Sequence, residues 1–115
     1  MKIINITKGT VVADNAVIAS TFFKRLKGLL GRKSIEKGEA LIIQSCNSIH
    51  SFFMRFPIDV LFVNKTDKVV AVTNSFAPFR ISKIYFTASY VIELPAGSIK
   101  ATSTSVGDKI EITAG

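Results

Sequence analysis

The segment from Cys46 to Asp59 brings together the residue types that most often do chemistry. The chain has one cysteine and one histidine, and both lie here with one of its two methionines. Cys46, His50 and Met54 are four residues apart at each step, so their side chains share a face on either a strand or a helix. A thiol, an imidazole and a thioether are ligands that suit Cu(I) or a blue-copper-like centre. The spacing therefore supports the hypothesis of a metal-handling protein.

Cys46 and His50 also allow a thiol-dependent chemistry, because a thiol beside an imidazole can form a reactive thiolate–imidazolium pair. Asn47, Asn74 or Asp59 could orient such an imidazole, but nothing in the spacing selects one of them. The sequence therefore assigns no catalytic residue and leans against an enzyme. The structural alternative is that cysteine and methionine are ordinary core residues. No second cysteine or histidine is available to complete a zinc site.

Arg55 and Asp59 are also four residues apart, but Pro57 between them prevents a continuous helix. They could form a structural ion pair, or Arg55 could be the anion-binding group of a pocket with aromatic walls. Asp59 opens an apolar strand, so a buried carboxylate at this position needs a partner or backbone donors. The predicted ligand-binding residues are Ser51, Phe53, Met54, Arg55 and Asp59.

Size and composition predict one soluble domain over residues 1–115. Of these residues, 48% are hydrophobic, enough for one core without covalent staples. A single cysteine cannot form an internal disulfide, which fits a reducing compartment. The first residues lack the apolar region of a signal peptide, and the apolar runs are too short for a transmembrane segment. We therefore expect a cytoplasmic protein.

The net charge of +7 raises the question of an anionic partner. Several of the basic residues fall between Lys24 and Lys37. The chain has no aromatic–basic alternation like that of a single-strand binder. A solvated basic face is the favoured interpretation, and weak anion or nucleic-acid binding through a basic helix is the alternative.

The apolar pattern predicts an α+β, mainly β fold with about seven or eight short strands and one amphipathic helix. The helix follows an N-cap at Ser20 or Thr21, has its apolar face on Phe22 to Leu30, and ends at Gly31. We expect a curled antiparallel sheet, either a partial barrel or a sandwich. The predicted strands are Lys2–Thr7, Val11–Ala13, Ala16–Ala19, Ala40–Ile43, Ile58–Val63, Lys68–Thr73, Tyr90–Leu94 and Lys109–Thr113.

Turn composition predicts how some of these strands connect. Asp14-Asn15 is typical of a hairpin tip, and residues 64–67, Asn-Lys-Thr-Asp, predict a second hairpin. Residues 74–81 contain Pro78 and are expected to form a loop. Glu93 alternates with apolar residues, so we expect it to face solvent or to meet Arg55.

Three ordered segments resemble a known family. The central one, Cys-Asn-Ser-Ile-His-Ser-Phe-Phe-Met-Arg-Phe-Pro-Ile-Asp, spans residues 46–59. Residues 25–32 resemble an arginine-x-x-glycine-leucine helix, and residues 88–97 followed by Gly107-Asp108 resemble a C-terminal pattern. Together they are similar to the family called domain of unknown function 192. The resemblance implies a compact β-rich fold with one helix, and it implies no established activity.

The family has a second form, in which the central motif reads serine-phenylalanine-tryptophan-methionine-lysine-asparagine. That form lacks the cysteine and histidine of this chain, so chemistry at Cys46 and His50 could belong to one branch only. A function common to the family would depend more on Met54, Arg55, Pro57 and Asp59.

The leading functional prediction is a non-enzymatic ligand-binding or accessory module with an aromatic–basic site around Phe52–Asp59. The alternatives are a copper-type or thiol-dependent protein, and a weak anion or nucleic-acid binder. The partner is expected to be a small molecule or a protein. The sequence selects no cofactor, no particular ligand and no oligomeric state.

Overall fold

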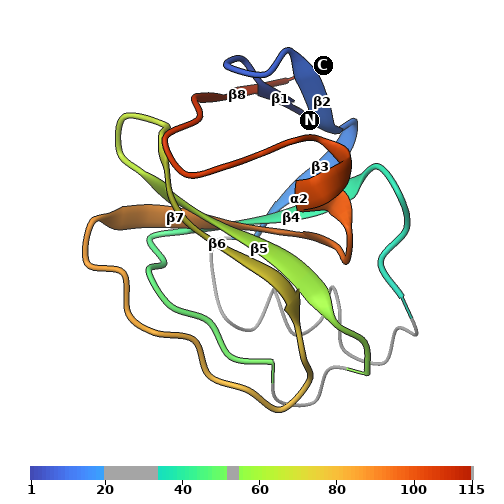
Figure 1. Ribbon diagram of the computed structural model, residues 1–115, viewed down its shortest axis with the longest axis vertical. Coiled ribbons are helices and arrows are strands. Elements are labelled where there is room, and N and C mark those ends of the chain that lie inside the picture. The colour runs from blue at the N-terminus through green and yellow to red at the C-terminus, as the bar shows by residue number, and fades with distance from the viewer. Residues whose placement is uncertain (20–33, 52–54, 115) are drawn as a thin grey trace.

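The computed structural model describes residues 1–19, 34–51 and 55–114, which form eight strands and one short helix in two sheets (Figure 1). The helix α2 is the four-residue Ser98–Ala101. The strands are β1 (Lys2–Asn5), β2 (Thr10–Ala13), β3 (Asn15–Ala19), β4 (Glu39–Gln44), β5 (Ile58–Asn64), β6 (Val69–Phe76), β7 (Ala88–Pro95) and β8 (Ile110–Thr113). The mainly β class is therefore confirmed.

The larger sheet has five strands in the order β3-β4-β7-β5-β6. Strand β5 lies beside β7 and β6 and is buried along Ile58–Val63. Such a continuous apolar strand is expected where both faces of a sheet are covered. Two apolar clusters do cover it: Phe62 and Val91 belong to one, and Leu61 and Ile92 belong to the other.

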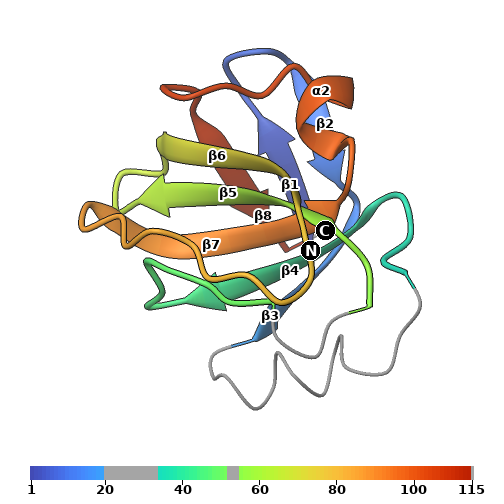
Figure 2. The same ribbon diagram turned by 60° about the horizontal axis from the view of Figure 1, so that its bottom comes forward.

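The smaller sheet, in the order β2-β1-β8, packs with α2 over one face of the larger sheet (Figure 2). Ile3 and Ile110 come from this sheet and are almost fully buried against Leu61 and Ile92. An isolated bridge between Lys68 and Lys109 brings the two sheets together at one side. The sheets do not close into a barrel, and an opening remains between β8 and the part of the larger sheet that contains β3 and β4.

The Asn64–Asp67 hairpin is confirmed, because β5 and β6 pair in antiparallel fashion across that turn. The hairpin predicted at Asp14-Asn15 is wrong. Strand β2 pairs with β1, whereas β3 pairs in parallel with β4 in the other sheet. The chain therefore crosses between sheets at this point. The amphipathic helix predicted to follow an N-cap at Ser20 or Thr21 and to end at Gly31 lies outside the described residues.

Two further expectations need correction. Strand β6 continues to Phe76, so the loop begins later than residue 74. Glu93 is not a solvent-facing residue, because its side chain is fully buried. Alternation predicts exposure only when one face of a sheet is wet, and both faces of β7 are covered here. Within the described ranges, no helix is long and apolar enough to span a membrane.

Candidate functional site

Cys46 follows β4 and is half-buried. Its thiol donates a hydrogen bond to the carbonyl oxygen of Ser48 at 2.9 Å. It lies on the wall of a shallow, mostly polar depression of about 300 Å³, with Asn47 and Ser89 as neighbours. The thiol is thus engaged locally and lies beside polar groups.

His50 is half-buried, and its backbone forms an isolated bridge with Ile81. Met54, the third member of the predicted metal set, lies outside the described residues. Across the parts of the chain that the structure describes, no three His, Cys, Asp or Glu side chains gather to hold a metal ion. Metal binding by Cys46, His50 and Met54 therefore stays a prediction.

Ser51 and Asp59 belong to the predicted ligand-binding set, and both are fully buried. The Ser51 hydroxyl donates to the Ala77 carbonyl at 2.5 Å and accepts the backbone N–H of Arg80 at 2.9 Å. The Asp59 carboxylate accepts two backbone N–H groups, those of Ser75 and Ile99, each at 2.8 Å. These contacts position the β6 end, the loop after it and the start of α2.

Arg55 is exposed, so its guanidinium is accessible to a partner in solvent. Phe53 and Met54 lie outside the described residues. Of the predicted ligand-binding residues that the structure describes, Ser51 and Asp59 are buried and bind the backbone, whereas Arg55 is exposed. Contact between Arg55 and an anionic ligand stays a prediction.

A buried polar network at Asp108 ties the smaller sheet to the loop after α2. Asn5 donates from its amide to Asp108 at 2.9 Å and to Thr104 at 3.1 Å. Lys8 forms a 2.9 Å ion pair with the same carboxylate. Burial alone would raise the pKa of Asp108, but hydrogen bonds from Asn5, Lys8 and Ser105 lower it to about 2. The network supplies hydrogen-bond partners to the buried side chains of Asn5, Thr104 and Asp108, so we interpret it as structural.

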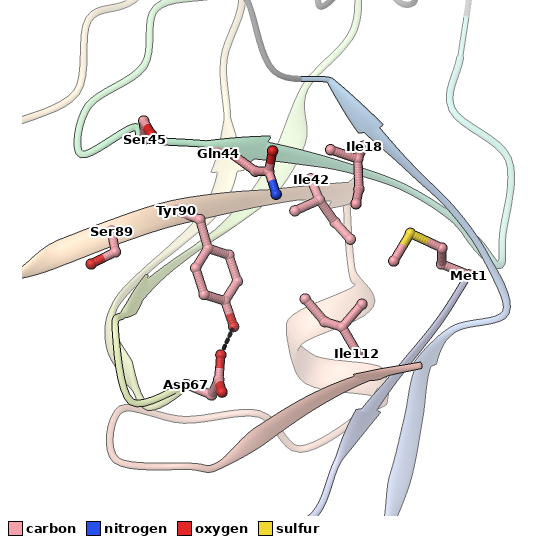
Figure 3. Close-up of a pocket in the computed structure, with 9 residues that line it drawn as sticks. All are labelled: Met1, Ile18, Ile42, Gln44, Ser45, Asp67, Ser89, Tyr90 and Ile112. Carbon is pink, nitrogen blue, oxygen red and sulfur yellow. Dashed lines mark hydrogen bonds between the residues drawn. The ribbon is translucent and has the colours of Figure 1, made fainter. Parts of the chain in front are cut away.

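The opening between the two sheets contains a pocket of about 400 Å³, here called the intersheet pocket (Figure 3). Its walls come from β3, β4, β7, β8 and the turn between β5 and β6, so it forms only when both sheets are in place. The lining residues are Met1, Ile18, Ile42, Gln44, Ser45, Asp67, Ser89, Tyr90 and Ile112.

The intersheet pocket has an apolar side and a polar end. Ile18, Ile42 and Ile112 supply the apolar side (Figure 3). At the polar end, the phenol of Tyr90 donates to Oδ1 of Asp67 at 2.8 Å. Burial, the hydrogen bond to Asp67 and the negative charge of Asp67 all raise the pKa of Tyr90 well above its ordinary value of 10.0. The phenol therefore stays protonated at physiological pH and remains a donor to Asp67.

The polar end offers acceptors to an incoming molecule. The proton of Tyr90 is already committed to Asp67, so the phenol oxygen and the second carboxylate oxygen are available to accept. Among the described lining residues there is no lysine, arginine or histidine side chain. The N-terminal ammonium of Met1 is the cationic group of this lining, and it donates to the Ala16 carbonyl at 3.2 Å. A donor such as an amine or a hydroxyl fits this end, and a carboxylate or phosphate would meet a like charge.

Sequence reasoning placed Asp67 in a turn and Tyr90 in a strand, and it assigned neither to a site. The two residues are 23 positions apart and meet only because β7 and β5 are neighbours. No local motif joins them. The nearest signal in the sequence is the turn composition of residues 64–67, which places Asp67 at the end of a hairpin turn.

The family model for DUF192, described as "Uncharacterized ACR, COG1430", matches residues 3–112. The chain belongs to this family. Its UPF0127 relative from Thermococcus sibiricus is 36% identical over 113 residues, which cover 95% of this chain and 73% of that protein. The UPF0127 protein from Pyrococcus furiosus is 36% identical over 111 residues, covering 94% of this chain and 95% of that one. Neither name records an activity.

Two solved structures share the fold of this DUF192 protein. A protein of unknown function from Novosphingobium aromaticivorans superposes with a TM-score of 0.82 at 20% identity, covering 97% of this chain and 84% of that chain. A protein from Sinorhizobium meliloti, described as a candidate transcription regulator, has a TM-score of 0.77 at 21% identity and covers 96% and 89%. At this level of identity the likeness establishes the two-sheet architecture alone.

Proposed function

We propose that this DUF192 protein is a non-enzymatic binding module whose ligand occupies the intersheet pocket. The ligand is a small, largely apolar molecule that carries a hydrogen-bond donor, with aryl-alkyl amines and alcohols as the best-fitting classes. The observation that carries the proposal is a 400 Å³ pocket with an apolar side of isoleucines and an acceptor end at Tyr90 and Asp67.

The shape and lining of the intersheet pocket support this class of ligand. Small-molecule pockets fall between about 300 and 1,000 Å³ and combine apolar walls with a few polar groups that fix orientation. The intersheet pocket lies at the lower end of that range, so it suits a single-ring molecule. The isoleucine side chains supply burial of apolar surface, and Tyr90 adds an aromatic face that attracts a cation.

The same groups favour binding over catalysis. Tyr90 is held protonated by burial and by Asp67, so it is a poor general base at neutral pH. Neither a thiol nor an imidazole lines the intersheet pocket. Recognition by shape and by two acceptors is the role that these residues can perform.

We propose that this binding module acts in the cytoplasm. Because Cys46 is the single cysteine, it forms no disulfide within the chain and can stay in the reduced thiol state. Cytoplasmic reductants maintain that state. An intracellular amine or alcohol would therefore reach the protein in its reduced form.

Isothermal titration calorimetry with phenethylamine and phenylacetate tests the proposal, because the two probes share a ring and differ in the charged group. We expect phenethylamine to bind and phenylacetate to bind at least about tenfold more weakly, since the latter brings a negative charge to Asp67. Ile18→Trp should weaken phenethylamine binding at least about tenfold by filling the pocket mouth.

Val17→Trp is the matched control, because Val17 neighbours Ile18 on β3, is 58% exposed and does not line the pocket. This variant should bind phenethylamine as the parent protein does. The proposal would be overturned by equal affinity for both probes, by equal losses in the two tryptophan variants, or by absence of heat up to about 10 mM phenethylamine.

A further inference from the structure

The loop after β6 forms an irregular ribbon with the segment after β4, and this ribbon lies on the face of the larger sheet that the smaller sheet leaves uncovered (Figures 1 and 2). Backbone hydrogen bonds join the two segments at several points. The N–H of Ser82 donates to the carbonyl of Ile49 at 2.8 Å, and the N–H of Tyr85 donates to the carbonyl of Asn47 at 2.9 Å. Ile49 is buried, and the ring of Tyr85 contacts Phe62 with centroids 4.4 Å apart. The ribbon is therefore anchored on its inner side.

Residues 79–86 are here called the apolar loop. Four large hydrophobic side chains on its outer side are exposed to solvent. Phe79 is 64% exposed, Ile81 69%, Ile84 55% and Phe86 86%. Isolated exposed hydrophobic residues are ordinary, but four within eight residues of one loop mark an interaction surface. Phe79 also has a positive φ of 61°, which bulky residues rarely adopt.

Positive charge is interleaved with these side chains. Arg80 lies between Phe79 and Ile81, Lys83 precedes Ile84, and both cations are exposed. The sequence contains no aspartate or glutamate between Asp67 and Glu93. The apolar loop is therefore both hydrophobic and cationic, with no carboxylate of its own to neutralise it.

We propose that the apolar loop docks on the surface of an anionic lipid bilayer. Phenylalanine and isoleucine side chains gain free energy by entering the boundary between headgroups and acyl chains, and lysine or arginine gains by contact with lipid phosphates. The net charge of +7 adds a long-range attraction to the same surface. This inference concerns a different face from the intersheet pocket and does not depend on ligand binding there.

The pattern favours a bilayer over a protein partner. The buried centre of a protein interface is depleted in charged residues, and lysine is depleted there in particular. In the apolar loop Lys83 directly precedes Ile84, so a protein that covered Ile84 would bring this lysine to the interface. At a bilayer surface, each cation keeps contact with phosphate and water while its neighbours insert.

Vesicle co-sedimentation tests the proposal with the full chain. The probes are vesicles of equal parts phosphatidylglycerol and phosphatidylcholine, and vesicles of phosphatidylcholine alone. We expect binding to the anionic vesicles, with partitioning at least about tenfold weaker on phosphatidylcholine. The double variant Ile84→Ser with Phe86→Ser should lose at least about tenfold in partitioning onto the anionic vesicles.

Two matched controls separate the loop from general surface properties. Val11→Ser with Val106→Ser removes hydrophobic side chains that are 52% and 60% exposed elsewhere, and it should leave binding unchanged. Arg80→Glu with Lys83→Glu should weaken binding more than Lys65→Glu with Lys100→Glu, which makes the same charge change on other exposed surfaces. Thermal unfolding of each variant checks that the fold is intact.

Three outcomes would overturn the proposal. The first is absence of sedimentation with anionic vesicles at low salt. The second is an equal loss in the loop variants and their controls, which would assign binding to overall charge. The third is a dimer in analytical ultracentrifugation that dissociates in the Ile84→Ser, Phe86→Ser variant, which would assign the apolar loop to a second copy of the chain.

Discussion

Asp59 lies near the start of β5, and Asp67 lies in the turn that follows the same strand, yet their surroundings differ in kind. Asp59 is fully buried, and each of its oxygens accepts a backbone N–H at 2.8 Å. Asp67 is half-buried, uses one oxygen to accept the Tyr90 phenol, and faces the intersheet pocket. One aspartate holds three elements of the fold together, whereas the other is placed where a small molecule can reach it.

The comparison shows why a carboxylate in a dense motif need not be the one that binds. Burying a charge is unfavourable unless donors surround it, and at Asp59 those donors are backbone groups from β6 and α2. Both oxygens of that carboxylate are then engaged by the fold. Asp67 keeps an available oxygen because its turn lies at the edge of an opening between two sheets.

The largest loss of stability is expected when Asp59 is substituted. Asp59→Ala leaves two backbone N–H groups without their acceptor, so we expect unfolding free energy to fall by about 3 kcal/mol. Urea denaturation measures this loss. The matched change Asp67→Ala should have less than about half that effect, because Asp67 accepts one side-chain donor near solvent. Equal losses would contradict the distinction between the two aspartates.

Asp108 provides a third aspartate and an acid-dependent test. Its folded pKa of about 2 is below its ordinary 3.8, so its contribution is complete above pH 4 and is lost as pH falls toward 2. Because Lys8 is partly exposed, we expect this contribution to be on the order of 1 kcal/mol. Asp108→Asn should therefore be less stable at pH 7 and show a shallower loss between pH 4 and 2 in urea denaturation. Parallel curves in that window would contradict this assignment.

Tyr90 provides the corresponding test of stability at alkaline pH. Its pKa is raised above 10.0, so the folded state retains a proton that the unfolded state releases. Its contribution is complete below pH 10 and declines as pH rises beyond that value. Tyr90→Phe should therefore lose stability less steeply between pH 10 and 11. In the parent protein, absorbance at 295 nm should show no phenolate from Tyr90 at pH 10, and its appearance there would contradict the buried pair.

The smallest stability change is expected for Asp67→Asn, which keeps an acceptor for Tyr90 and removes the charge. We expect a change of less than about 1 kcal/mol in unfolding free energy. Phenethylamine affinity should nevertheless fall by about tenfold, and the difference between the amine and phenylacetate should shrink. Calorimetry on the variant and on Glu111→Gln, an exposed control on β8, checks this. Unchanged phenethylamine affinity in Asp67→Asn would show that the Asp67 carboxylate is not the acceptor for the amine.

The sequence predicted the parts of the fold that local patterns determine. Strands β5 and β6 and their turn are identified by continuous apolar residues around Asn64–Asp67. The hairpin at Asp14-Asn15 failed because turn composition does not specify which strands pair. Strand β3 instead pairs in parallel with β4, and the paired residues are more than 20 positions apart in the chain. Such pairing depends on long-range contacts that periodicity does not contain.

The site could be predicted less well than the fold. The Cys46–Asp59 segment is distinctive in composition, but burial decides what its members do, and Ser51 and Asp59 are used by the backbone. The intersheet pocket depends on Ile18, Asp67 and Ile112, which are far apart in sequence. Sheet packing brings them together, so no spacing rule could have found them.

The central claim is that the intersheet pocket binds a small donor-bearing molecule, and isoleucine-methyl NMR during a phenethylamine titration tests it most directly. The account predicts saturable shifts at the methyl groups of Ile18, Ile42 and Ile112, which line the pocket, with little change at Ile49. Shifts at Ile49 or at the exposed Ile84, with the pocket methyl groups unmoved, would contradict the account.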